Sequence, residues 1–304
     1  MTTKTKKIAL ILSGGGAKGA FQCGAERYAR EVKGYHWDII AGVSVGALNG
    51  AMLAMEKYTR LLEVWNTISN DRVYTGGFNL WGVLRLLFGA QSFYGNEPLW
   101  RLLQAELEPE KITTDLRIGA VSLVSGEYVQ FTKDSPALAE AILASTIMPV
   151  IWSPLNVSDE YPTMVDGGVR NISPLGDVLA LDPDELVVIN CSPQQPARLN
   201  EPPKNVLQIG LRTLDLMLNE IFVNDLHTFQ RINALVKQAE DKGLELTHPG
   251  KGRKLRYVPC HVIEPDYDLG DTLDFSQPTV QASLQAGVRR AREVLGELRR
   301  GGER

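Results

Sequence analysis

The segment Ile-Ile-Ala-Gly-Val-Ser-Val-Gly-Ala-Leu-Asn-Gly-Ala-Met-Leu-Ala, residues 39–54, is the stretch that decides the fold. Its apolar start, Ile39 to Val43, predicts a strand, and the small residues that follow predict a helix, with Ser44 at the corner. Gly42 and Gly46 leave room for a tight turn and for close packing of the helix. This context is typical of a nucleophile elbow, which presents a serine hydroxyl at the positive end of a helix. The pattern alone also describes an ordinary turn, so further parts of an active site are needed.

Segments typical of strands and helices alternate along the rest of the chain. Predicted strands are residues 8–12, 39–43, 116–124, 127–132, 164–165, 185–190 and 257–263, and predicted helices are residues 17–32, 48–66, 136–145, 205–242 and 279–300. Such alternation indicates an α/β sandwich built on a mostly parallel sheet.

The overall composition is that of an ordinary globular protein. The 304 residues are 44% hydrophobic and 22% charged, and a net charge of -4 argues against a broad nucleic-acid interface. The basic start is followed by only five apolar residues, too few for a signal peptide, and no run is long enough for a transmembrane helix. We expect one domain over residues 1–304. The Pro-rich stretch Ser192 to Pro203 is the best candidate boundary, but it also reads as a loop after a strand.

Three widely spaced cysteines, Cys23, Cys191 and Cys260, form neither a disulfide framework nor a metal-binding spacing. This pattern is typical of a reducing compartment, so a cytoplasmic location is expected, and no metal site is predicted.

A glycine-rich loop, Ser-Gly-Gly-Gly-Ala-Lys-Gly at residues 13–19, follows the first predicted strand and opens a helix. It matches the Gly-x-Gly-x-x-Gly pattern of dinucleotide sites, which also requires an acidic residue at the end of the second strand. Ser44 occupies that place instead, and no Gly-Lys-Ser/Thr motif is present. Consecutive glycines can also direct backbone N–H groups at a single anion. The loop therefore predicts an oxyanion hole formed by Gly14, Gly15 and Gly16.

A serine nucleophile needs a base, and the sequence offers two kinds. Of the four histidines, only His261 lies late enough for a Ser–Asp–His order. The stronger candidate is Asp166, which ends a short predicted strand and is followed by Gly167 and Gly168. A carboxylate there can lie at the same sheet edge as Ser44 and accept its proton, provided that its pKa is raised. The alternative is a turn aspartate that caps its own loop.

Taken together and in this order, Gly-Gly-Gly-Ala-Lys-Gly, Gly-Val-Ser-Val-Gly and Asp-Gly-Gly resemble the motifs of the patatin-like phospholipase family. Residues 144–149, Ala-Ser-Thr-Ile-Met-Pro, are similar to the family's Ala-Ser-x-x-x-Pro segment. Pro174 fits its Asp-Gly-Gly-x-x-x-Asn-x-Pro continuation, and Asn171 lies one position before the Asn of that pattern. The resemblance covers about residues 7–190, and nothing after Pro203 is diagnostic.

This resemblance implies a three-layer α/β/α sandwich related to the α/β-hydrolases, with residues 204–304 as a helical extension packed on it. It implies a Ser–Asp dyad in which Ser44 is the nucleophile and Asp166 the base. Gly15 and Gly16 would donate N–H groups to the oxyanion, and Gly14 would shape the turn. The remaining motif positions are Lys18, Gly19, Gly42, Gly46, Gly167 and Gly168. For Lys18, a role in phosphate binding or loop structure and a solvated surface position are both open.

The resemblance further implies hydrolysis of acyl esters in phospholipids or other glycerolipids, without a metal or organic cofactor. Peripheral contact with a membrane would accompany such a substrate. The apolar stretch Phe78 to Phe88 could provide it as a lid or line an acyl groove, or it could be a buried helix. Three alternatives stay open: an esterase or thioesterase for soluble acyl esters, a nucleotide- or phosphate-binding module, and a catalytically silent relative.

Overall fold

A computed structural model of the protein describes residues 6–76, 92, 94–149, 151–196, 198–199, 201–250 and 252–296. The strands are β1 (Ile8–Leu12), β2 (Ile39–Gly42), β3 (Thr75–Gly76), β4 (Tyr94–Gly95), β5 (Asp115–Ser122), β6 (Tyr128–Thr132), β7 (Met164–Asp166), β8 (Glu185–Ile189) and β9 (Cys260–Ile263). The α-helices are α1 (Gly19–Lys33), α2 (Val45–Ala54), α3 (Tyr58–Thr67), α4 (Asn70–Val73), α6 (Glu97–Glu106), α7 (Leu138–Ser145), α8 (Leu175–Leu179), α9 (Val206–Glu240) and α10 (Gln277–Leu295). Three short 3₁₀ helices are η1 (Gly16–Lys18), η2 (Pro109–Lys111) and η3 (Gly167–Val169).

The main sheet has the strand order β6-β5-β2-β1-β8-β9, and β7 also pairs with β5. Strands β5, β2, β1, β8 and β9 run parallel, whereas β6 and β7 are antiparallel to β5. The predicted mostly parallel sheet is therefore confirmed.

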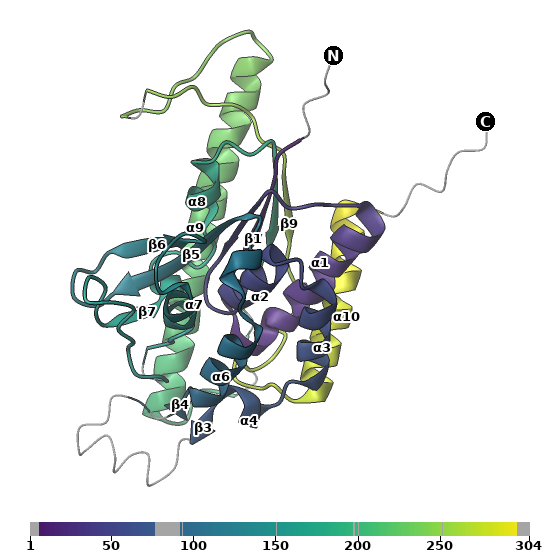
Figure 1. Ribbon diagram of the computed structural model, residues 1–304. Helices are drawn as coiled ribbons and strands as arrows, with labels where there is room; N and C mark the ends of the chain where they lie inside the picture. The colour runs from purple at the N-terminus through teal and green to yellow at the C-terminus, as the bar shows by residue number, and fades with distance from the viewer. Residues whose placement is uncertain are drawn as a thin grey trace.

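Helices cover both faces of this sheet, and the alternation of side chains along β1 shows how. Leu10 and Leu12 belong to a core shared with α1, α2 and α10. Ala9 and Ile11 belong to a second core, on the other face, which includes Phe222 of α9. Figure 1 shows α9 on one side of the sheet and α1, α2 and α10 on the other. The three-layer α/β/α architecture is thus confirmed.

The last described helix packs tightly on the first. A Cβ atom at Gly24 of α1 would lie 2.0 Å from the Leu284 carbonyl oxygen, and one at Gly287 of α10 would lie 2.1 Å from the Phe21 carbonyl oxygen. Glycine is required at both positions because the two backbones are in contact there. Since α9 and α10 both pack on the sheet, we propose that residues 204–296 form one domain with the preceding part of the described chain.

One predicted element differs from the structure. The helix expected over residues 48–66 is interrupted between α2 and α3, where Glu56 has a φ of 57°. A residue in the left-handed region cannot continue a right-handed helix. The short strand predicted before Asp166 is present as β7, and it runs antiparallel to β5. The apolar stretch Phe78 to Phe88 lies outside the described residues. None of the helices that the structure describes is long and apolar enough to cross a membrane.

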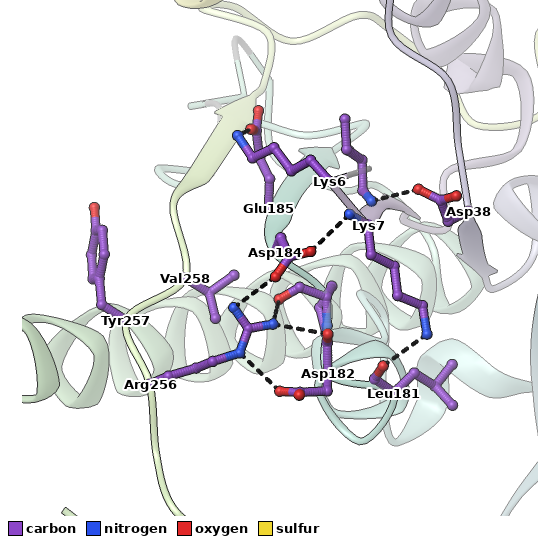
Figure 2. A network of polar contacts seen from close by, with 12 residues as sticks. Lys6, Lys7, Asp38, Leu181, Asp182, Asp184, Glu185, Arg256, Tyr257 and Val258 are labelled. Atoms are coloured by element: carbon purple, nitrogen blue, oxygen red, sulfur yellow. Dashed lines mark hydrogen bonds and ion pairs between the residues drawn. The ribbon is translucent and has the colours of Figure 1, made fainter. Parts of the chain in front are cut away.

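Ionic contacts close the edge of the sheet at which the parallel strands begin (Figure 2). The Lys7 N–H donates to an Asp184 carboxylate oxygen at 2.8 Å, and the Ile8 N–H donates to Asp38 at 2.8 Å. Arg256 pairs with Asp184 at 3.1 Å. This edge is therefore occupied by structural contacts, and the functional candidates lie at the opposite edge.

Candidate active site

Strands β2 and β7 meet end to end beside β5, and this meeting brings Ser44 and Asp166 together. Strand β6 pairs with one side of β5. Strands β2 and β7 both pair with its other side, one after the other along its length. In the register of β5, Gly42 pairs with Ile118 and Asp166 pairs with Ala120. Since β7 is antiparallel, its carboxyl end points toward the carboxyl end of β2. Ser44 follows Gly42 by two residues, as Ala120 follows Ile118, so Ser44 and Asp166 lie at the same position along β5.

Ser44 lies at the turn that the sequence predicts. Its φ of 58° and ψ of -129° are unusual for a residue other than glycine, and it immediately precedes α2. The turn is tight because a Cβ atom at Gly42 would lie 2.1 Å from the Gly46 carbonyl oxygen. A Cβ atom at Gly46 would lie 2.3 Å from the carbonyl oxygen of Leu12 in β1. These contacts give a physical reason for both glycines of the motif.

Asp166 is buried, with 6% of its surface exposed. Its Oδ1 accepts the Gly168 N–H at 2.7 Å, and the Ser44 side chain lies close enough to lower the pKa of this carboxyl. Burial raises the pKa of Asp166 to about 6, and the contacts with Ser44 and Gly168 limit this rise. A Cβ atom at Gly167 would lie 2.4 Å from the Gly119 carbonyl oxygen, so β7 ends in direct contact with β5. The carboxylate is both a capping residue of its own turn and a partner of Ser44.

The glycine loop lies against Ser44, but its three glycines differ in what their N–H groups do. The Gly14 N–H donates to the Ile172 carbonyl at 3.1 Å and is therefore engaged within the fold, which agrees with the expectation that Gly14 shapes the turn. Gly15 and Gly16 have φ values of 156° and 54°. Within the described part of the chain, no hydrogen bond engages the N–H of either residue. A Cβ atom at Gly14 would lie 3.1 Å from the Ser44 Cβ. The glycine at this position therefore lets the loop backbone pass close to Ser44.

Lys18 ties this loop to a distant part of the chain. Its side chain is 8% exposed, and its Nζ lies 3.2 Å from an Asp268 carboxylate oxygen. The neighbouring Ala17 N–H donates to the Thr272 carbonyl at 2.8 Å. Lys18 is therefore a buried, paired lysine and not a solvated surface residue. Sequence patterns missed the contribution of residues 268–272, because nothing in that segment resembles a known motif.

The remaining glycine of the first motif has a packing role. A Cβ atom at Gly19 would lie 2.3 Å from the Val45 Cγ2, so α1 can approach the start of α2 only because this residue is glycine.

The histidine alternative is contradicted by the positions of the side chains. His261 Nε2 lies 3.3 Å from Glu185 Oε1, and Glu185 is the first residue of β8. That is the edge at which the parallel strands begin, whereas Ser44 lies beyond the edge at which they end. No histidine among the described residues lines the cavities next to Ser44.

Two cavities share Ser44 in their lining, and their other lining residues differ in polarity. One is an apolar cavity of about 110 Å³, lined along α2 by Leu48, Met52 and Met55, and by residues of α3, α4, α6 and the loop before α10. The other is a cleft of about 450 Å³ that holds Asp166 and the glycine loop together with polar residues. Its polar and charged residues include Lys18, Asn190, Arg212, Asp215, Asn219, Asp268 and Asp271. Sequence analysis identified neither the cavity nor the contribution of α9 to the cleft.

Comparison with known proteins identifies the family. The family model described as "Patatin-like phospholipase" matches residues 10–179, more than half of the chain. The chain belongs to the patatin-like phospholipase family. This confirms the resemblance seen in the motifs.

Individual relatives are more distant. The cGAMP-activated phospholipase of Escherichia coli (strain TW11681) is 26% identical over 190 residues, which are 55% of this chain and 53% of that protein. The chain thus spans about half the length of this curated relative. Among solved structures, the crystal structure of VipD from Legionella pneumophila has a TM-score of 0.48 and 13% identity, covering 96% of this chain and 67% of that one.

Proposed function

We propose that this patatin-like protein is a serine lipid acyl hydrolase that cleaves carboxylic esters of glycerolipids. Ser44 would act as the nucleophile, Asp166 as the general base, and the N–H groups of Gly15 and Gly16 as the oxyanion hole. Glycerophospholipids presented at a membrane surface are the proposed substrates.

The reaction proceeds in two halves. Ser44 transfers its proton to the Asp166 carboxylate as its oxygen attacks the ester carbonyl, and the Gly15 and Gly16 N–H groups bind the oxyanion that forms. Asp166 returns the proton to the departing alcohol oxygen, which leaves an acyl group on Ser44. Asp166 then takes a proton from water, the hydroxide attacks the acyl carbonyl, and the fatty acid is released as Ser44 regains its proton.

The observation that carries the proposal is the position of Ser44 between an apolar cavity and a polar cleft. Helix α2 starts beside Ser44 and rises about 1.5 Å per residue, so Met52, which lines the cavity, lies about 12 Å along it. An apolar lining of that length suits an acyl chain, because each buried methylene contributes about 0.8 kcal/mol. The cleft suits the polar remainder of a lipid.

This arrangement favours a lipid over the alternatives. A soluble short-chain ester would use the same dyad, and the vesicle assay below separates it from a lipid. A dinucleotide would bring its phosphates to a cleft in which Lys18 is already paired with Asp268 and further carboxylates belong to Asp166, Asp215 and Asp271. Like charges at such short range oppose binding of a polyphosphate. The intact Ser44–Asp166 contact argues against a catalytically silent protein.

The test combines fluorophosphonate labelling of the protein with fatty-acid release from phospholipid vesicles. The wild type should be labelled and should release fatty acid, Ser44→Ala should lose both, and Asp166→Asn should lose at least about 100-fold in release. Ser173→Ala and Asp225→Asn are matched controls. The Ser173 hydroxyl is buried without a partner among the described residues, and Asp225 lies on α9 outside both cavities. Both should behave as wild type.

Each alternative gives a different result. Labelling that survives Ser44→Ala would assign another nucleophile. Hydrolysis of soluble acyl esters without release from vesicles would indicate the soluble esterase. Binding of a labelled nucleotide by a protein that fluorophosphonates do not label would indicate the binding module.

A further inference from the structure

Two residues at and just beyond the end of α7 are hydrogen-bonded to the members of the proposed dyad. The Ser44 N–H donates to the Ser145 Oγ at 2.9 Å. Two residues later, the Ile147 carbonyl accepts the Asp166 N–H at 2.9 Å. Ser145 and Ile147 are fully buried, each with 0% of its surface exposed. A single rigid segment is therefore hydrogen-bonded to the backbone of Ser44 and to that of Asp166.

The bond to Ser145 satisfies a donor that the elbow leaves without a regular partner. With a φ of 58°, Ser44 directs its N–H neither into the ladder of β2 nor into the hydrogen bonds of α2, although its carbonyl accepts the Ala47 N–H. A buried N–H without an acceptor destabilises a protein by roughly 1–3 kcal/mol. The hydroxyl of Ser145 supplies the acceptor and thereby favours the turn that directs the Ser44 side chain at Asp166.

We infer that Ser145 is a positioning residue, which holds Ser44 beside Asp166 through the segment that also anchors Asp166. This inference rests on the proposed function, because it assigns a role within the same dyad. Ser145 does not contact the substrate; it acts through the backbone of Ser44. The segment Ser145–Ile147 sets the separation of nucleophile and base, since it is bonded to both.

Ser145→Ala removes the acceptor and keeps the backbone. We expect kcat for acyl release to fall by about 10- to 100-fold with KM changed less than twofold, because a small displacement of a catalytic group reduces rate more than binding. The rate constant of fluorophosphonate labelling should fall by the same factor. Ser145→Thr, which keeps a hydroxyl, should retain more activity than Ser145→Ala. Ser173→Ala, which removes another buried hydroxyl, should leave both rates unchanged.

The pH profile separates positioning from general support of the fold. The contact with the Ser44 side chain holds the pKa of Asp166 down, so its loss should move the acidic limb of the rate profile of Ser145→Ala to higher pH. Other titratable groups that face Asp166 are unchanged by this substitution. They are Tyr128 on β6 and the cleft residues Lys18, Arg212, Asp215, Asp268 and Asp271. A purely structural role would lower the melting temperature without moving this limb.

The inference is overturned if folded Ser145→Ala has the kcat and the acidic limb of the wild type, or if Ser173→Ala loses as much activity. If Ser145→Ala does not fold, Ser145→Cys decides, because it keeps the volume but offers only a weak acceptor. Wild-type kcat in that variant would refute the inference, and a lowered kcat with a shifted limb would support it. Release that persists in Ser44→Ala or Asp166→Asn would instead refute the proposed dyad itself.

Discussion

Replacing Asp166 with asparagine should inactivate the protein and at the same time stabilise it. Burial raises the pKa of Asp166 from 3.8 to about 6, which means that the folded protein resists ionisation of this group. The folded state keeps the proton up to about pH 6, whereas the unfolded chain releases it near pH 3.8. The resulting loss of stability is absent well below pH 3.8, grows between these two values, and is complete above pH 6.

The size of the effect follows from the two pKa values. A difference of 2.2 pH units, from 3.8 to about 6, corresponds to about 3 kcal/mol at about 1.4 kcal/mol per unit. Asparagine has no charge to bury, and its carbonyl oxygen can still accept the Gly168 N–H. For 304 residues the entropy of unfolding is about 0.6 kcal/mol/K, so Asp166→Asn should melt about 5 °C higher at pH 7.5.

Thermal denaturation of wild type and variant across pH 4 to 8 measures this difference. The increase in the free energy of unfolding of Asp166→Asn over the wild type should be only about 1 kcal/mol at pH 4.5, because Asp166 of the folded wild type is protonated there. Asp266→Asn is a control of opposite sign, because Arg289 lowers the pKa of the Asp266 carboxyl and the substitution removes a favourable contact. A melting temperature of Asp166→Asn that is equal to or below that of the wild type at pH 7.5 would refute the burial argument.

Three further predictions concern pH, chain length and packing. Because the proposed base must be ionised, kcat/KM should fall about tenfold per pH unit below an apparent pKa near 6, and a profile that is flat from pH 7 to pH 5 would contradict the role of Asp166. Ala51 lines the cavity about 10 Å along α2 from Ser44, so Ala51→Leu should lower kcat/KM for long acyl chains at least tenfold relative to short ones; an unchanged ratio in assays with esters of graded length would place the acyl chain elsewhere. Gly24→Ala should lower the free energy of unfolding by more than about 2 kcal/mol in denaturant titrations, because its Cβ would lie 2.0 Å from the Leu284 carbonyl oxygen, whereas Gly126→Ala in an open turn should cost less.

Local patterns in the sequence were sufficient for the family, the layered α/β fold and the residues proposed for catalysis. The elbow at Ser44 was predictable because a strand, a turn and a helix each depend on neighbouring residues, and glycines mark where the backbone must bend or approach closely. The same holds for the glycine loop at residues 14–16 and for Asp166 before two glycines. These motifs are short, and their geometry is set mostly by residues within the motif.

Tertiary structure alone decided how these motifs act together. The antiparallel course of β7 brings Asp166 to Ser44, the Ile172 carbonyl occupies the Gly14 N–H, and Lys18 is buried against Asp268. Ser145 reaches Ser44 from 101 residues away, and Lys18 and Asp268 are 250 residues apart. Each of these contacts joins segments whose separation in the sequence carries no local signal. They arise because two cores fix the helices on both faces of one sheet, and only that packing determines which backbone and side-chain groups meet.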